Sequence, residues 1–288
     1  MRKESYVNCK LCPRQCGVDR TAGQTGFCGC SDVALVAKSM LHKWEEPALA
    51  GAGGSGAIFF GGCTLGCSYC QNRTISKRPV GKPMDSAQLR SLMEDLIAQG
   101  AENIDLVTPT HFLPTILPAL EKPLPVPVVY NCGGYERTET IRALAGKVDI
   151  YLPDMKYGDN ALGKILSGAA DYFEVATAAI REMVRQTGPA QWQGEKLLRG
   201  VVIRHLILPG QVENSLKVLD WIGETFAPGE VLVSLMRQYT PIPGMQPPFD
   251  RRVTDEEYQA VLSWMYLNDL DGFTQEEQSA DTGFIPDF

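Results

Sequence analysis

Six short apolar runs, separated by longer amphipathic stretches, constrain the fold of this chain more than any other feature of its sequence. Each run is rich in Val, Ile, Leu or Phe, as strands buried on both faces are. The runs span residues 57–62, 104–108, 126–131, 148–153, 201–208 and 231–236. Strands that alternate with helices predict an α/β fold with a parallel sheet and right-handed crossovers. Such units fit an incomplete barrel or a doubly wound sheet, and the pattern alone leaves both open.

The stretches between the runs carry helix signals. Residues 85–99 begin with Asp85 at the cap position and end before Gly100, a common helix stop. Further helices are predicted over residues 136–144, 171–186, 213–226 and 254–268. In parallel β/α architectures the chemistry gathers at the carboxyl ends of the strands. Polar or glycine-rich residues follow all six runs, so we expect these strand ends to form the rim of one site.

The charge and the amino terminus exclude several classes of protein. A net charge of −7 argues against a general nucleic-acid binder, which needs a basic surface. No apolar signal-peptide core follows the first basic residues, and no long uncharged stretch has the apolar composition of a membrane span. We therefore expect a cytoplasmic protein with neither a nucleic-acid nor a membrane partner. Eight of the nine cysteines lie within the first 70 residues, which in such a chain indicates metal ligation or redox chemistry.

Cys63, Cys67 and Cys70 form a C-x3-C-x2-C triad directly after the first apolar run. Thiolates are the usual ligands of iron–sulfur clusters. Three of them on one loop can hold three irons of a 4Fe–4S cubane and leave the fourth open to the amino and carboxylate groups of a substrate. A tetrahedral zinc site needs a fourth ligand, which this loop lacks. A zinc loop completed by a distant residue, or chance clustering, is the alternative.

A second cysteine group lies in residues 1–50, of which residues 1–46 show no helical or strand periodicity. Cys9, Cys12, Cys16 and Cys28 are spaced C-x2-C-x3-C-x11-C, and Cys30 is an alternative to Cys28 as a ligand. Four thiolates at these intervals could close a structural zinc site or hold an auxiliary 4Fe–4S cluster. The third reading is a loop-rich cap that contains reduced cysteines.

The triad after a first strand, with Tyr69 before its third cysteine, resembles the radical SAM superfamily. More narrowly, the chain is similar to relatives of pyruvate formate-lyase activating enzyme that carry a Cys-x-x-Cys-Pro-Arg-x-Cys-Gly leader, matched here by residues 9–17. Further matches lie at the strand ends, in residues 107–111, 130–135, 151–157, 204–210 and 234–239. The likeness therefore spans nearly the whole chain.

The resemblance implies a partial six-stranded parallel β/α barrel of the radical SAM type over residues 51–288, including a C-terminal tail, after a cysteine-rich metal-binding leader over residues 1–50. It also implies the cofactors, a 4Fe–4S cluster and S-adenosylmethionine (SAM). One electron, from reduced flavodoxin or ferredoxin, would break the S–C5′ bond of SAM and give a 5′-deoxyadenosyl radical that abstracts hydrogen from a substrate.

The resemblance further implies which side chains bind SAM. These are Tyr69, Thr108, Thr110, Asn131, Asp154, Lys156, Arg204 and His205. The two threonines would lie near the methionine amino group, the Asp-x-Lys pair beside SAM, and the Arg-His pair near its carboxylate or ribose. Cys132, alone at the third strand end, is by default a small buried residue and is also a candidate catalytic group.

The sequence leaves the substrate open. By analogy with activating enzymes, the leading hypothesis is hydrogen abstraction from a protein, such as a glycine of a glycyl-radical enzyme. A radical SAM enzyme that acts on a small molecule is the runner-up. From other classes come a non-catalytic Fe–S carrier or electron-transfer protein, which would bind iron without cleaving SAM, and a zinc-binding interaction protein.

Overall fold

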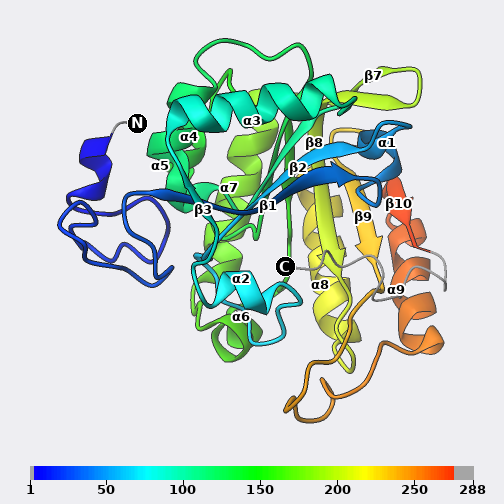
Figure 1. Cartoon of the computed structure of the whole chain (residues 1–288). Coiled ribbons are helices and arrows are strands. Elements are labelled where there is room, and N and C mark those ends of the chain that lie inside the picture. Colours follow the sequence, from blue (N-terminus) through cyan, green and yellow to red (C-terminus); the bar gives the residue numbers. More distant parts are fainter. Residues whose placement is uncertain (1–2, 276–288) are drawn as a thin grey trace.

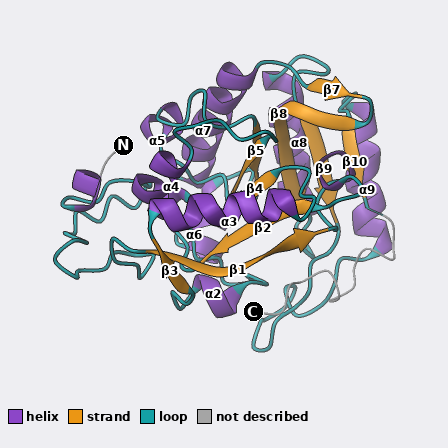
Figure 2. Cartoon of the chain, turned by 45° about the horizontal axis from the view of Figure 1, so that its top comes forward, coloured by secondary structure: helices purple, strands orange, loops and turns teal. Residues whose placement is uncertain are grey.

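The computed structural model describes residues 3–275, so the C-terminal tail from residue 276 onward lies outside the described residues. The described strands form one mixed sheet in the order β10-β9-β8-β6-β5-β4-β2-β1-β3, and β7 pairs with β8 off this path (Figures 1 and 2). Their bounds are β1 Ala34–His42, β2 Ser55–Phe60, β3 Lys82–Met84, β4 Ile104–Val107, β5 Val128–Cys132, β6 Ile150–Pro153, β7 Gln191–Gln193, β8 Lys196–Leu206, β9 Leu232–Met236 and β10 Gly272–Thr274.

Six neighbouring strands of this sheet are the six predicted runs. β2, β4, β5, β6, β8 and β9 pair in parallel from one to the next, which confirms the predicted α/β fold. All five residues of β5, all four of β6 and all five of β9 are buried. Strands covered on both faces have no polar side to alternate with, and this is why they appear in the sequence as continuous apolar runs.

The helices lie mainly in the crossovers between these strands (Figure 1). Their bounds are α1 Pro47–Ala50, α2 Arg73–Ser76, α3 Ser86–Ala98, α4 Leu113–Ala119, α5 Thr138–Arg142, α6 Asn160–Ser167, α7 Tyr172–Thr187, α8 Val212–Thr225 and α9 Asp255–Leu267, with 3-10 turns at Lys3–Tyr6 and Thr110–Phe112. The five predicted helices are α3, α5, α7, α8 and α9. Asp85 and Thr254 close capping boxes at the starts of α3 and α9.

None of the helices in residues 3–275 is long and apolar enough to cross a membrane.

Residues 1–46 show no strand periodicity, yet residues 34–42 form β1, which pairs antiparallel with β2. A bulge between Val36 and Lys38 interrupts its alternation, so the sequence pattern does not reveal it. The loop between β1 and β2 contains α1, whose Leu49 packs with Val129 and Ile150 of the parallel strands. This packing fixes the loop against the sheet and carries the residues before α1 toward the strand ends.

The leader is fastened to the barrel by buried polar contacts. Arg20 has no exposed surface, and its guanidinium donates hydrogen bonds to the carbonyls of Ser31 and His111 while lying 4.4 Å from the Tyr6 ring centre. Thr140 at the start of α5 donates to the carbonyl of Leu11 at 2.7 Å. The leader, blue in Figure 1, thus lies against the α4 and α5 side of the molecule.

Candidate active site

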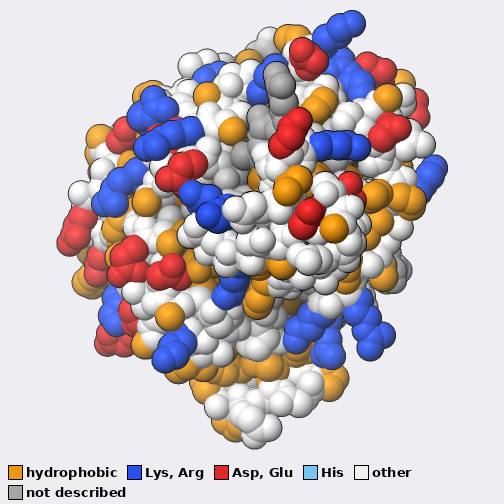
Figure 3. All heavy atoms as spheres, turned by 90° about the vertical axis from the view of Figure 1, so that its left-hand side faces the viewer, with side chains coloured by type: hydrophobic (Ala, Val, Ile, Leu, Met, Phe, Trp, Pro, Cys, Tyr) orange, Lys and Arg blue, Asp and Glu red, His pale blue; other side chains and the backbone are white. Residues whose placement is uncertain are grey.

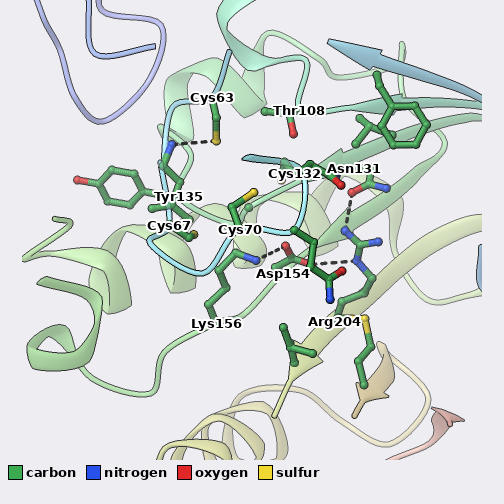
Figure 4. Close-up of a pocket in the computed structure, with 18 of the residues that line it drawn as sticks. Cys63, Cys67, Cys70, Thr108, Asn131, Cys132, Tyr135, Asp154, Lys156 and Arg204 are labelled. Atoms are coloured by element: carbon green, nitrogen blue, oxygen red, sulfur yellow. Dashed lines mark hydrogen bonds and ion pairs between the residues drawn. The ribbon is translucent and has the colours of Figure 1, made fainter. Parts of the chain in front are cut away.

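A pocket of about 270 Å³ opens at the carboxyl ends of the parallel strands. The loop after β2 contributes to its lining, as do the ends of β4, β5, β6, β8 and β9. Ten of the side chains predicted from sequence line it: Cys63, Cys67, Tyr69, Cys70, Thr108, Asn131, Cys132, Asp154, Lys156 and Arg204. Figure 4 shows the three thiols on one side of this space, with Asp154 and Arg204 across from Cys63. The expected rim of strand ends is therefore one site.

The triad loop begins with a turn that only glycine accommodates. Gly62 has a φ of +83°, and a Cβ added to it would lie 2.4 Å from Cys30 Sγ, which is far too close. The leader thus packs directly against the residue before Cys63. The turn aims the following thiols into the pocket rather than along the strand (Figure 4).

The three thiols raise one another's pKa values electrostatically. Burial raises the pKa of Cys63 to about 12, and the nearby Cys67 and Cys70 add to the rise. Burial, followed by Cys67, also raises the pKa of Cys70. Thiolates packed this closely need a cationic partner, and iron supplies one when it binds.

The arrangement of the thiols suits a cluster. Cys63, Cys67 and Cys70 lie on the loop after β2 and line the same pocket. In a 4Fe–4S cubane each thiolate binds a different iron, so the ligands surround a body instead of converging on one point. The donor set of Cys63, Cys67 and Cys70 therefore fits a cubane.

A charged network lies opposite the thiols. Asp154, just after β6, accepts hydrogen bonds from Lys156 Nζ at 2.6 Å and from Arg204 Nε at 2.9 Å. Burial alone would raise the pKa of Asp154, but the charges of Arg204 and Lys156 outweigh it and lower that pKa. Burial would likewise lower the pKa of Lys156, and Asp154 with Cys67 raises it instead. Asp154, Lys156 and Arg204 are thus held in their charged forms.

Arg204 is the centre of this network. Its guanidinium also donates to Asn131 Oδ1 at 2.6 Å and to Glu45 Oε1 at 3.2 Å, so one fork joins β5, β6, β8 and the β1–β2 loop. Asn131 in turn donates to Asp105 of β4 at 3.2 Å, and burial and then Glu45 raise the pKa of Asp105 well above its ordinary value. A planar guanidinium can bind three acceptors in different directions, whereas an ammonium on the same strand could not do so in a fixed geometry.

Thr108 is held in a conformation that costs free energy. Its φ is +58°, which is rare for any residue with a Cβ and rarer for a β-branched one. Its backbone N–H donates to the carbonyl of Asn131 at 2.8 Å, which ties the turn to β5. Strain of this kind, about 1–3 kcal/mol, collects at functional sites.

Two of the predicted SAM contacts, His205 and Thr110, do not line this pocket. His205 is fully buried outside the lining, with its ring nitrogens 2.6 Å from Met155 O and 2.9 Å from Ser215 Oγ. Successive residues of a strand face opposite sides, so Arg204 points into the pocket and His205 points away. Thr110 is also buried outside the lining, and its hydroxyl donates to Glu136 at 2.7 Å.

The pocket contains side chains that the sequence reasoning missed. Glu45 and Trp44 come from the β1–β2 loop, and Glu136 follows β5. Burial raises the pKa of Glu136 to about 8, and its Oε2 has no hydrogen-bond partner among the described residues. Cys132 lines the pocket beside it, where burial and then Glu136 raise the pKa of its thiol well above the ordinary value. Glu45 meets Arg204, and Glu136 meets Thr110, only in the folded chain, so no local motif identifies these two carboxyl groups as part of the site.

The leader thiols divide into two places. Burial raises the pKa of Cys12 to about 12, and the nearby Glu136, Cys28 and Cys16 add to the rise. A hydrogen bond from Cys30 is the main reason that the pKa of Cys28 falls to about 5. Cys9 instead packs with Tyr6 and Leu11, and its sulfur lies 3.8 Å from Arg20 Nη1. The structure thus brings Cys12, Cys16 and Cys28 near one another and turns Cys9 toward Arg20.

Comparison with known proteins agrees with this geometry. The family model described as the radical SAM superfamily matches residues 57–222. The chain is 29% identical to "Uncharacterized protein MJ0674" of Methanocaldococcus jannaschii over an alignment of 287 residues. The alignment covers 93% of this chain and 77% of that protein. It is similar in fold to a radical SAM methyltransferase from Sphaerobacter thermophilus, with a TM-score of 0.53 at 15% identity over 76% of this chain and 65% of that one.

A second solved structure has the same fold. Streptococcus suis SuiB bound to its precursor peptide SuiA matches with a TM-score of 0.50 at 12% identity, over 74% of this chain and 46% of that one. The chain spans less than two thirds of the length of both solved proteins, 65% and 46%. The chain belongs to the radical SAM superfamily. Membership implies an enzyme that carries a 4Fe–4S cluster and binds SAM.

Proposed function

We propose that this radical SAM enzyme binds its 4Fe–4S cluster on Cys63, Cys67 and Cys70 and abstracts a hydrogen atom from a peptide or protein. The observation that carries the proposal is a pocket in which three thiols lie across from the Asp154–Arg204 ion pair. A ligand that joins a metal cluster to a charged, hydrogen-bonding group matches both sides of this space. SAM has such a form, since its methionine end carries charge and its adenosine end carries hydroxyls.

When bound, the cluster and SAM supply a one-electron cleavage of the S–C5′ bond that gives methionine and a 5′-deoxyadenosyl radical, which becomes 5′-deoxyadenosine on taking a substrate hydrogen atom. The protein binds and orients SAM with Tyr69, Thr108, Asn131, Asp154, Lys156 and Arg204. Asp154 and Lys156 stay ionised in the pocket because each neutralises the other. They therefore offer fixed charges at no cost of reorganisation when SAM arrives.

A macromolecular substrate is supported by two features. Trp44 lines the pocket and is 65% exposed, so the mouth presents a large apolar surface beside the site. SuiB, which shares the fold, holds a precursor peptide in its solved structure. A peptide loop that lies over Trp44 would bring a backbone Cα–H, such as that of a glycine, to the pocket. Cys132, which lines the same pocket, is the candidate for a catalytic thiol there.

Deuterium transfer tests the substrate class. A lysate from cells grown in deuterated medium is separated into macromolecules and a small-molecule filtrate, and each is added to the reduced enzyme with SAM. We expect deuterium in the 5′-deoxyadenosine formed with the macromolecules. Deuterium only from the filtrate would overturn the protein substrate and favour a small-molecule radical enzyme.

A non-catalytic Fe–S carrier is the second candidate class. It would bind iron at the triad but would have no need of the strained Thr108 or the Arg204 fork, both of which line the pocket. A carrier would also give no 5′-deoxyadenosine with any reductant.

We also propose that an acidic electron-carrier protein, such as reduced flavodoxin or ferredoxin, binds beside α2. No Asp or Glu occurs between Glu46 and Asp85. This stretch carries four exposed cations directly after the triad, Arg73, Lys77, Arg78 and Lys82. Among residues 3–275 none of the four forms an ion pair. In Figure 3, Lys and Arg side chains gather at the lower right without acidic neighbours.

Charge reversal tests this surface. In Lys77→Glu/Arg78→Glu, the rate of cluster reduction by reduced flavodoxin should fall about tenfold or more at low salt. Attraction between the basic surface and the acidic flavodoxin speeds their association by about this factor, and the variant replaces the attraction by repulsion. Lys122→Glu/Lys147→Glu is the matched control, since these residues precede β5 and β6 at the opposite end of the barrel. Reduction by titanium(III) citrate should stay unchanged in both. Equal flavodoxin rates in both variants would overturn the surface.

A second metal centre in the leader is part of the proposal. Cys16 and Cys28 each lie close enough to Cys12 to raise its pKa, and Cys9 or Cys30 would complete a set of four. Iron and zinc content per chain tests it. Cys16→Ala should lose a metal that the wild type holds, either zinc or about half of the iron, while the triad keeps its own iron. Equal metal content in the two proteins would show that these thiols bind none.

We also propose a cytoplasmic location, because the cysteines of residues 3–275 form no disulfide.

A further inference from the structure

Each thiol of the triad accepts a hydrogen bond, and the bond to Cys67 comes from far along the chain. Cys63 Sγ accepts from the backbone N–H of Leu65 at 3.4 Å, and Cys70 Sγ accepts from Ser76 Oγ at 3.5 Å. Both donors belong to the triad loop or to the helix that follows it. Cys67 Sγ accepts from Ser167 Oγ at 3.2 Å, a donor 100 residues away at the end of α6. Within residues 3–275, Cys67 is therefore the triad thiol that is hydrogen-bonded to another part of the barrel.

Ser167 is oriented for this bond. Its hydroxyl also lies 2.6 Å from the hydroxyl of Tyr157. A serine hydroxyl has one hydrogen and two lone pairs, so when Ser167 donates to Cys67 it must accept from Tyr157. The Tyr157 hydroxyl also lies 3.1 Å from that of Tyr69, and its single hydrogen then goes to Ser167 instead of Tyr69. Ser167 is 4% exposed and Cys67 is 7% exposed, so water is largely excluded from the bond. A hydrogen bond in such a place counts for more than one on the surface.

The leader holds Ser167 in position through Arg14. Its guanidinium donates to the carbonyls of Ser167 at 2.7 Å and Gly168 at 2.5 Å. The same group donates to the carbonyls of Thr64 at 3.1 Å and Leu65 at 3.0 Å, which belong to the triad loop. It also lies 3.9 Å from the ring centre of Phe27. One leader side chain thus joins the triad loop to the end of α6, with the directional donors that only a guanidinium has.

We infer that Ser167 and Arg14 are positioning residues of the iron–sulfur site, and this inference rests on the cluster proposed above. Ser167 raises the reduction potential of the cluster through its hydrogen bond to Cys67. Arg14 fixes Ser167 and the triad loop at the separation that this bond requires. Reduction adds negative charge to the cluster and its sulfurs, so a donor to a ligand sulfur stabilises the reduced form. The leader therefore takes part in setting the potential at which SAM can be cleaved.

An EPR-monitored redox titration without SAM tests the inference. In Ser167→Ala, the ratio of reduced to oxidised cluster at the wild-type midpoint should fall about threefold to tenfold, and tenfold corresponds to about 59 mV for one electron. Ser167→Thr keeps the hydroxyl and should restore the ratio. Ser68→Ala is the matched control, because its buried hydroxyl is next to Cys67 and has no partner among the described residues. Iron content should stay at the wild-type level in all three.

Two further variants test how Ser167 is held in position. Tyr157→Phe should lower the ratio in the same direction by less, since Ser167 keeps its hydrogen but loses the group that orients it. Arg14→Lys should lower it and broaden the EPR lines, because one ammonium cannot hold four carbonyls. A midpoint in Ser167→Ala equal to that of Ser68→Ala would overturn the inference. So would loss of iron in Ser167→Ala that Ser167→Thr repairs, since Ser167 would then only support the fold. A wild type that binds no cluster would instead refute the proposed function.

Discussion

Replacing Arg204 by methionine should cost the native state about 3–5 kcal/mol of unfolding free energy. Breaking a buried ion pair by removing one partner leaves an uncompensated charge, which accounts for a loss of this size. The side chain of Arg204 is 16% exposed, and those of Asp154 and Glu45 are 14% and 9% exposed. Both carboxylates would lose their bond to the guanidinium, and Asn131 would lose its donor. Lys156 would remain beside Asp154, which keeps the loss within this range.

Anaerobic urea unfolding measures the loss. Arg199→Met is the control on the same strand, since within residues 3–275 the hydrogen bonds of the Arg199 side chain go to the backbone carbonyls of Thr187 and Gln186. Its loss should be about 1–2 kcal/mol. Adding Glu45→Gln to Arg204→Met should recover about 1–2 kcal/mol, because one of the stranded charges is then gone. If Arg204→Met loses no more unfolding free energy than Arg199→Met, Arg204 does not neutralise the buried carboxylates as assigned.

Two further predictions concern single side chains of the site. Because Thr108 has a φ of +58°, Thr108→Gly should be more stable than Thr108→Ala by about 1 kcal/mol, and an alanine variant with the higher urea midpoint would contradict the strain. Burial raises the pKa of Glu136 from 4.5 to about 8, so the native state binds the extra proton between these pH values and stability falls as pH rises through them. Glu136→Gln should remove up to about 1.4 kcal/mol of this loss per pH unit, and parallel stability–pH curves for the two proteins would refute the assignment.

The parallel core of the fold could be predicted because strands that are buried on both faces appear in the sequence as continuous apolar runs. β2, β4 and β5 appear as apolar runs with no polar face. β1 shows no such run, since its bulge breaks the alternation and much of it is half-buried. β3, β7 and β10 have three residues each, too few for any period to be seen. α6 did carry a signal, with Asp159 as its cap and Gly168 as its stop, that could have located it.

The site was predictable where a motif names the residue and not where distant parts of the chain meet. The triad, Asp154 and Lys156 follow from local patterns. His205 lies outside the lining of the pocket, which its motif could not reveal, because a motif gives the order of residues without the face of the strand on which each one lies. Glu45 meets Arg204 across 159 positions, and Ser167 meets Cys67 across 100. Only the folded chain brings such pairs together, so no spacing rule could have found them.

The most direct test of the account is the anaerobic formation of 5′-deoxyadenosine. The reconstituted protein is reduced with dithionite, given SAM, and the product is measured by mass spectrometry against a variant in which Cys63, Cys67 and Cys70 are all alanine. Product from the wild type and none from the variant is the predicted result. If the wild type carries an intact, reducible cluster but gives no more product than the variant, even with a macromolecular fraction added, the proposed activity is contradicted.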